Sequence, residues 1–151
     1  MGKLGDEFPD KLVERGIFIE GGAFLKKGHQ FKDEKPKPRT FFVLNAQPET
    51  DEIIITVHAT TKIESRKKVR TPEVLVEIKE GEYEDLREFS IVDCESFIIW
   101  RKKTLQDNIK SGNIIPLKTV SKTLLIKLRK AIANSKTLAT IDKRLIIPEA
   151  K

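Results

Sequence analysis

The segment EIIITVHATT, residues 52–61, constrains the fold more than any other part of this sequence. Apolar residues occupy every second position from residue 53 to residue 59, at Ile53, Ile55, Val57 and Ala59. Successive side chains of an extended strand point to opposite faces. The segment therefore predicts a strand with an apolar face toward a core and a polar face, bearing Thr56, His58 and Thr60, toward solvent.

Similar short patterns flank this segment at intervals of roughly ten residues. An apolar run at 41–45, an alternating stretch at 73–79 and a third region at 89–100 predict further strands. Upstream, the sequence IFIE-GG-AFL predicts a hairpin, because glycine readily adopts the positive φ angles of a tight turn.

Helical periodicity is found at both ends of the chain. Residues 6–16 form a short amphipathic pattern that stops at Gly16. Near the other end the apolar residues recur every three or four positions, at Leu117, Val120, Leu124, Leu125, Leu128, Ala131 and Ile132. Short strands followed by an amphipathic C-terminal helix predict an α+β fold, built as a small antiparallel barrel or strongly bent sheet with added helices.

The length of 151 residues predicts one domain, residues 1–151, with one core. No apolar run approaches the roughly 18 residues of a membrane helix, and the first residues lack the apolar stretch of a signal peptide. We therefore expect a soluble, cytoplasmic protein without membrane contact. The single cysteine, Cys94, forms no internal disulfide and lacks metal-ligand spacing, so it is expected to be a small buried apolar residue.

Charge is unevenly distributed along the chain, which has a net charge of +6. Residues 62–70 hold five basic residues and one acid, and residues 101–136 hold ten basic residues and one acid. Residues 77–95 hold eight acids and two bases. This segregation predicts a basic face that attracts a polyanion, most plausibly nucleic acid.

Several enzyme classes lack their motifs. The sequence has no glycine-rich phosphate loop, no GxSxG, no Cys-His arrangement and no HExxH spacing. Cys94 lies between Asp93 and Glu95, where a reactive thiolate is disfavoured. We expect no metal and no cofactor.

The stretch KPKPRTFFVLNAQ, residues 35–47, is the main candidate for a binding site. Pro36 and Pro38 restrict the backbone before Arg39, and the apolar run that follows anchors it. A guanidinium group stays charged and binds two phosphate oxygens at once, so Arg39 suits a phosphate ligand.

The order KPRTFFVLN, EIIITVHATTK, KIESRKK, EVLVEI and REFSIVDCESFIIW, followed by an amphipathic helix, resembles the MazF/PemK/Kid family of toxin endoribonucleases over residues 26–142. In that family an arginine-proline pair opens a strand, a threonine ends the next strand, and a serine lies on a later one. Thr40 stands here where the family has proline, and residues 1–25, read as a helix and hairpin extension, have no counterpart in it.

The resemblance implies an SH3-like barrel at residues 26–142 and metal-independent cleavage of single-stranded RNA by its own 2′-hydroxyl. It also implies a homodimer and an acidic antitoxin as partner. Lys27-Gly28-His29 matches the glycine that opens the first core strand of the family. Arg39 matches the catalytic arginine and Thr60 the partner threonine, with Thr61 as the neighbouring alternative and Ser90 as the later serine.

Other residues are assigned by their chemistry. His58, on the same strand face as Thr60, is the candidate general acid or base, and His29 competes for that role. The cations expected to hold the flanking phosphates are Lys37, Lys62, Arg66, Lys67 and Lys68. Trp100 or Tyr83 is a candidate for stacking an unpaired base.

Each of these residues also has a structural interpretation, such as a surface ion pair for Arg39 or a solvent-facing strand position for His58. Two other functions stay open beside the ribonuclease. One is a non-catalytic module of the same fold that binds nucleic acid or protein. The other is an interaction toxin that poisons DNA gyrase, as a second relative of the fold does.

Overall fold

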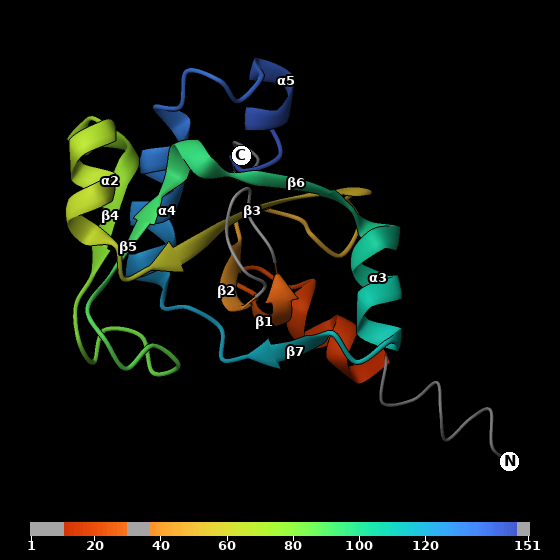
Figure 1. Ribbon diagram of the computed structural model, residues 1–151. Coiled ribbons are helices and arrows are strands. Elements are labelled where there is room, and N and C mark those ends of the chain that lie inside the picture. Colours follow the sequence, from red (N-terminus) through yellow and green to blue (C-terminus); the bar gives the residue numbers. More distant parts are fainter. Residues whose placement is uncertain (1–10, 30–36, 148–151) are drawn as a thin grey trace, which may run out of the picture.

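The computed structural model describes residues 11–29 and 37–147. Within them the chain has an α+β fold, with seven strands in one antiparallel sheet and five α-helices (Figure 1). The strands are β1 (Ala23–His29), β2 (Lys37–Val43), β3 (Ile53–Thr60), β4 (Leu75–Ile78), β5 (Ser90–Asp93), β6 (Ile98–Arg101) and β7 (Ile114–Leu117). The helices are residues 11–17, α2 (Ile63–Val69), α3 (Lys102–Lys110), α4 (Lys122–Ala133) and α5 (Thr140–Lys143). None of these helices is long and apolar enough to cross a membrane.

The sheet does not close into a barrel, so the barrel prediction is wrong. The strand order is β4-β5-β3-β2-β1-β7, and within the described residues the two end strands do not pair with each other. β3 is the central strand and binds two neighbours on one side, β6 along Ile53–Thr56 and β5 at Ala59 and Thr60.

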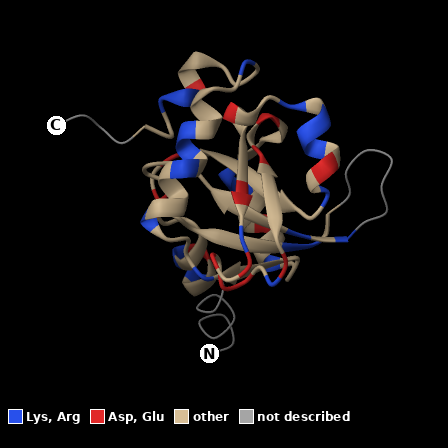
Figure 2. Cartoon of the chain, turned by 90° about the vertical axis from the view of Figure 1, so that its left-hand side faces the viewer, with Lys and Arg blue, Asp and Glu red and all other residues tan. Residues whose placement is uncertain are grey.

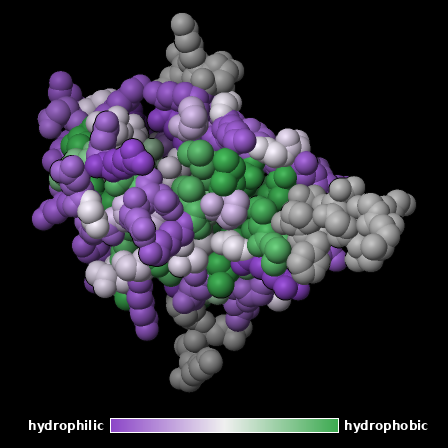
Figure 3. Space-filling model, turned by 90° about the horizontal axis from the view of Figure 1, so that it is seen from below, coloured by the Kyte–Doolittle hydropathy of each residue, from purple (hydrophilic) through white to green (hydrophobic). Residues whose placement is uncertain are grey.

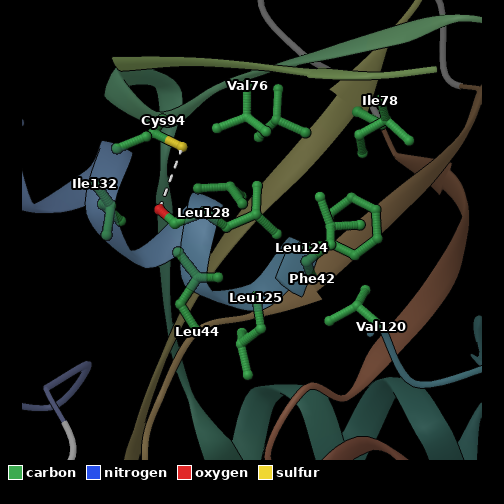
Figure 4. Close-up of a cluster of buried hydrophobic side chains, with 14 of the residues drawn as sticks. Phe42, Leu44, Val76, Ile78, Cys94, Val120, Leu124, Leu125, Leu128 and Ile132 are labelled. Carbon is green, nitrogen blue, oxygen red and sulfur yellow. Dashed lines mark hydrogen bonds between the residues drawn. The ribbon is translucent and has the colours of Figure 1, made fainter. Parts of the chain in front are cut away.

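The packing of helix α4 explains why the sheet does not need to close into a barrel. Leu124 and Leu128 of α4 belong to the same apolar cluster as Val76 of β4 and Val120, which follows β7 (Figure 4). The helix therefore covers the apolar face between the two edges of the sheet, and a helix packed on a sheet buries that face as well as a closing strand pair does.

The predicted amphipathic helix is confirmed as α4, with its boundaries shifted. Its buried residues are Leu124, Leu125, Leu128, Ala131 and Ile132. The helix begins after Ser121, whose side chain accepts a hydrogen bond from the Leu124 amide at 3.1 Å. Leu117 and Val120 precede the helix, because Leu117 ends β7. Cys94 is buried in this cluster with its Sγ 3.9 Å from the Leu128 carbonyl oxygen, as expected of an apolar filler (Figure 4).

Strand β3 is buried on both faces, whereas the alternation predicted one face toward solvent. Ile55 and Val57 face α4, as expected. The other face is covered by a second apolar cluster, which includes Phe24 and Phe41 from the sheet and Leu105 from α3. Residues with polar side chains on this face are therefore enclosed.

The predicted hairpin at residues 17–25 is absent. Residues 11–17 are helical, and the chain turns through residues 18–22 into β1. Gly21 has φ +78°, and Gly22 lies so close to the preceding helix that an added Cβ would be 2.0 Å from the Ile17 carbonyl oxygen. Glycine is needed here for a helix-to-strand turn and not for a two-residue hairpin.

We expect Gly22→Ala to destabilise the fold by at least about 2 kcal/mol, since the new methyl group overlaps backbone that has no room to move. Gly16→Ala is the matched control. Its Cβ would meet only the Pro116 side chain at 3.6 Å, and alanine in a helix stabilises by up to about 1 kcal/mol. Urea unfolding of both variants measures the difference, and equal midpoints would contradict the close-approach explanation.

The N-terminal segment packs against the lower side of the sheet in Figure 1, close to β7. Phe18 and Phe24 of this segment are buried, while Leu12 is exposed. Figure 3 shows apolar side chains at the surface on this underside. Ile19 and Ile115 are among the exposed large apolar residues of the described chain.

Within the part of the chain that the structure describes, the basic residues do not form the single face that the charge segregation predicted. The helix α3 packs on one face of the sheet through Leu105 and Ile109, and α4 packs on the other. The cations of residues 101–136 are therefore divided between two sides of the molecule. In Figure 2, Lys and Arg positions are spread over several elements, with acidic positions between them. Several lysines also pair with the acidic segment: Lys67 with Glu77, Lys118 with Glu84 and Lys127 with Glu82.

Candidate active site

Arg39 lies in the third position of β2, with only 8% of its surface exposed. It pairs with Lys26 on β1, while Phe41 pairs with Phe24. Alternation along β2 directs Arg39 to the same face as Phe41 and directs Thr40 to the opposite face. The strand begins at Lys37, earlier than the apolar run predicted at 41–45. Arg39 therefore lies within the sheet and not before its first strand residue.

His58 and Thr60 share this face with Arg39. Phe41 pairs with His58 across β2 and β3, and this is the last pair of the ladder. Arg39 lies two residues before Phe41 on β2, and Thr60 lies two residues after His58 on β3. Alternation keeps both side chains on the face of Phe41 and His58. His58 has 9% of its surface exposed, Thr60 is partly exposed, and the Thr60 hydroxyl accepts a hydrogen bond from the Lys62 amide at 3.2 Å.

A bulge in β1 brings His29 to the same face. Lys26 pairs with Arg39 and His29 pairs with Lys37, so β1 uses three residues where β2 uses two. The extra residue reverses the alternation. Gly28 within the bulge has φ +62°, which an L side chain rarely adopts. Without this irregularity the His29 side chain would point away from Arg39.

The two imidazoles flank one aromatic ring. The Phe41 ring centroid is 5.2 Å from that of His29 and 5.7 Å from that of His58. Trp100 packs on Phe41 at 5.7 Å and on His29 at 6.0 Å, and its indole N–H donates to the Thr56 hydroxyl at 2.8 Å. Trp100 therefore has a fixed orientation in the aromatic cluster.

Both histidines are neutral at pH 7. Burial, the charge of Arg39 and the neighbouring His29 lower the pKa of His58 to about 4, against a smaller opposing effect of Asp93. Burial and the charges of Lys26 and Arg39 lower the pKa of His29 to about 4. The pKa of His58 thus lies below the range usual for imidazole, because the side chain is enclosed and lies beside a cation.

The basic segment after β3 forms the helix α2, which has no buried residue. Arg66 donates to Asp93 at 3.2 Å, and Lys67 pairs with Glu77 at 2.9 Å. Lys62 and Lys68 are exposed, as is Lys37 at the start of β2. Arg66 and Lys67, both predicted to bind phosphate, thus already have carboxylate partners within the fold.

Ser90 and Tyr83 lie away from this group. Alternation in β5 places Ile91 on the face of Thr60 and directs Ser90 to the opposite face, where it is buried and donates to the Glu88 carbonyl oxygen at 3.0 Å. The Tyr83 hydroxyl donates to the Lys118 carbonyl oxygen, and its ring packs on Phe42 in the α4 cluster. Thr61 is exposed beyond the end of β3.

Asp93 and Arg70 were missed by sequence reasoning. Asp93 ends β5 with 2% of its surface exposed, and Arg70 at the end of α2 donates to it at 3.0 Å. The only signal was the acid within IVDC, where a charge follows two strand-forming residues and precedes a cysteine. A buried carboxylate of this kind requires cationic partners.

The group as a whole combines a buried cation, two neutral imidazoles and a hydroxyl on one face of the sheet. A guanidinium binds phosphate oxygens, and a neutral imidazole accepts a proton. These are the parts required for phosphodiester cleavage by an internal hydroxyl.

No protein-family model matches this sequence, and no curated protein matches it. Among solved structures, the chain is similar to one described as an endoribonuclease in complex with its cognate antitoxin from a mycobacterial species. That likeness has a TM-score of 0.49 and 14% sequence identity, and it covers 80% of this chain and 96% of the other.

Proposed function

We propose that this protein is a metal-independent endoribonuclease that cleaves single-stranded RNA by attack of the 2′-hydroxyl on the adjacent phosphate. The observation that carries the proposal is the gathering of Arg39, His58 and His29 on one face of the sheet. Three strands contribute these residues, and the charge of Arg39 acts on both imidazoles.

In this proposal Arg39 binds the scissile phosphate and stabilises the charge that develops on it. Thr60, at the end of the neighbouring strand, donates a hydrogen bond to the same group. His58 is neutral at pH 7 and accepts the proton of the 2′-hydroxyl. His29 is less enclosed than His58, and a bound phosphate raises its pKa, so it is the group that donates a proton to the leaving 5′-oxygen.

The exposed cations at the margin of the group would hold the flanking phosphates. Lys37 precedes Arg39 on β2, and Lys62 and Lys68 follow β3. Binding through such contacts weakens as salt increases, because each neutralised phosphate releases counterions. Trp100 borders the same cluster and is the candidate for stacking a base.

Incubation of the purified protein with single-stranded RNA in EDTA tests the proposal. We expect fragments that end in 2′,3′-cyclic phosphate, detected by mass spectrometry. An oligonucleotide with 2′-deoxyribose at every position should stay intact, since it lacks the attacking hydroxyl. RNA that is bound but remains uncut across varied sequences would exclude the enzyme.

A second candidate function is a non-catalytic module that binds nucleic acid. The low exposure of Arg39 and His58 favours it, because a scissile phosphate must reach groups that are more than nine-tenths covered. In this case the exposed cations bind the RNA backbone and the enclosed histidines serve only packing. Such a module binds RNA and its 2′-deoxy analogue with similar salt dependence and cuts neither.

The biological context of the ribonuclease is also proposed. The resemblance to the MazF/PemK/Kid family suggests a cytoplasmic homodimeric toxin that a small acidic antitoxin neutralises. A short open reading frame for an acidic protein beside the gene would support this context. Co-expression would then be expected to relieve growth arrest caused by the protein alone.

A further inference from the structure

Asp93 is a buried carboxylate near the candidate site, and it accepts several hydrogen bonds. Its two oxygens accept hydrogen bonds from Arg66 at 3.2 Å and from Arg70 at 3.0 and 3.2 Å. They also accept from the Glu95 amide and the Ser96 hydroxyl, each at 3.0 Å. The amide and hydroxyl bonds fix the carboxylate in the turn after β5, and the remaining bonds reach across to α2.

The helix α2 depends on these ion pairs for its position. None of its residues is fully buried: Ile63 is partly buried and Val69 is exposed. Among the described residues, the ion pairs that join it to the strands are those of Arg66 and Arg70 with Asp93 and the exposed pair of Lys67 with Glu77. An exposed pair contributes little on its own, so among these ion pairs those with the buried Asp93 carboxylate contribute most to holding α2 against the strands.

The helix lies beside His58, on the side opposite to Arg39. In the sheet, β3 lies between β2, which carries Arg39, and β5, which carries Asp93. Ala59 pairs with Val92, so His58 and Asp93 are the next residues on their strands. Both residues point to the same face, and the charges of Asp93 and Arg66 both act on the His58 imidazole.

We infer that Asp93 is a positioning residue that holds Arg66 and Arg70 beside His58, so that α2 binds an RNA phosphate adjoining the one at Arg39. This inference rests on the proposed function. Asp93 uses one terminal nitrogen of Arg66, whose side chain is 31% exposed. The carboxylate thus orients the Arg66 guanidinium while part of the arginine side chain stays exposed to solvent.

Binding of a 2′-O-methyl RNA oligonucleotide, which cannot be cleaved, tests the inference separately from catalysis. Asp93→Asn keeps the size and polarity of the side chain and removes the charge that orients α2. We expect the Kd to rise about tenfold and the slope of log K against log salt to decrease by about 0.7 for each phosphate that the variant no longer neutralises. Arg66→Ala should have the same effect, and the double variant should be no weaker than either single variant.

Lys127→Ala is the matched control, since it removes a cation that also pairs with a carboxylate, Glu82, but lies on α4 at the other face of the sheet. Its Kd and salt slope should equal those of the wild type. If Asp93→Asn does not fold, as judged by circular dichroism, Arg70→Gln replaces it. This variant removes one surface partner of Asp93 and should raise the Kd about threefold.

Separate outcomes distinguish the two ideas. An Asp93→Asn variant that is folded and has wild-type Kd and salt slope overturns the positioning role, whatever the cleavage assay shows. Wild-type protein that binds the 2′-O-methyl RNA but does not cut ordinary RNA overturns the ribonuclease. The effect of Asp93→Asn on binding then still decides the role of Asp93.

Discussion

Replacement of Arg39 by alanine is expected to lower the rate of RNA cleavage by a factor of about 100 to 1,000, the usual effect of removing one preorganised charge from a phosphoryl or acyl transition state. The loss should appear mainly in kcat, because the contact strengthens as charge develops on the phosphate. Single-turnover cleavage of a labelled oligonucleotide measures it directly.

Two companion variants make this result specific. Arg39→Lys keeps the charge but loses the two-pronged contact, so its rate should lie between those of the wild type and the alanine variant. Lys130→Ala changes an exposed cation of α4, on the other side of the sheet, and should cleave at the wild-type rate. Thermal unfolding of all three checks that the fold persists. A folded Arg39→Ala variant with full activity would remove Arg39 from the mechanism.

The enclosed imidazole of His58 is expected to make stability strongly dependent on pH. Its pKa is about 4 in the folded protein and about 6.5 in the unfolded chain. As the pH falls, the unfolded chain takes up the proton first, which stabilises it relative to the folded state. The contribution of neutral His58 is therefore complete above about pH 6.5 and is lost progressively between pH 6.5 and pH 4. Between pH 7.5 and 4.5 we expect the loss to be about 2–3 kcal/mol.

Urea unfolding across this pH range, with His58→Gln as the reference, isolates the effect. The variant lacks the His58 imidazole but keeps every carboxylate and His29. The difference between the two curves of stability against pH therefore reports the titration of His58. The free energy of unfolding of the wild type, relative to that of the variant, should decrease as the pH falls. Parallel curves would show that the imidazole titrates alike in the folded and unfolded states, and that it is not enclosed as described.

The sequence of a segment predicted its strand or helix well where apolar residues recurred at a regular spacing. Alternation in residues 53–60 predicted the strand that became β3, and the spacing of Leu124, Leu128 and Ala131 predicted α4. Turn and boundary predictions were weaker. Gly21 and Gly22 predicted a hairpin, but the turn joins a helix to a strand, since both contexts require a positive φ or a close backbone approach.

Local sequence could not decide how the sheet ends. Strand propensity does not say whether β4 meets β7, because that depends on where α4 packs. Nor could it predict the bulge that turns His29 toward Arg39, since an extra residue in one strand is defined only by its partner. The same limit applies to Asp93, whose importance comes from two arginines that lie 23 and 27 residues away in sequence.

The sequence alone determined which residues of each strand share a face. His58 and Thr60 had to lie on the same face because side chains alternate along any extended chain. The tertiary structure decided what that face meets. It is covered by Phe41, Trp100 and the cluster around α3, so the face predicted to meet solvent is largely buried and holds a neutral His58 imidazole near Arg39. Alternation is a property of the backbone of one segment, whereas burial and pKa are set by what other segments place against it.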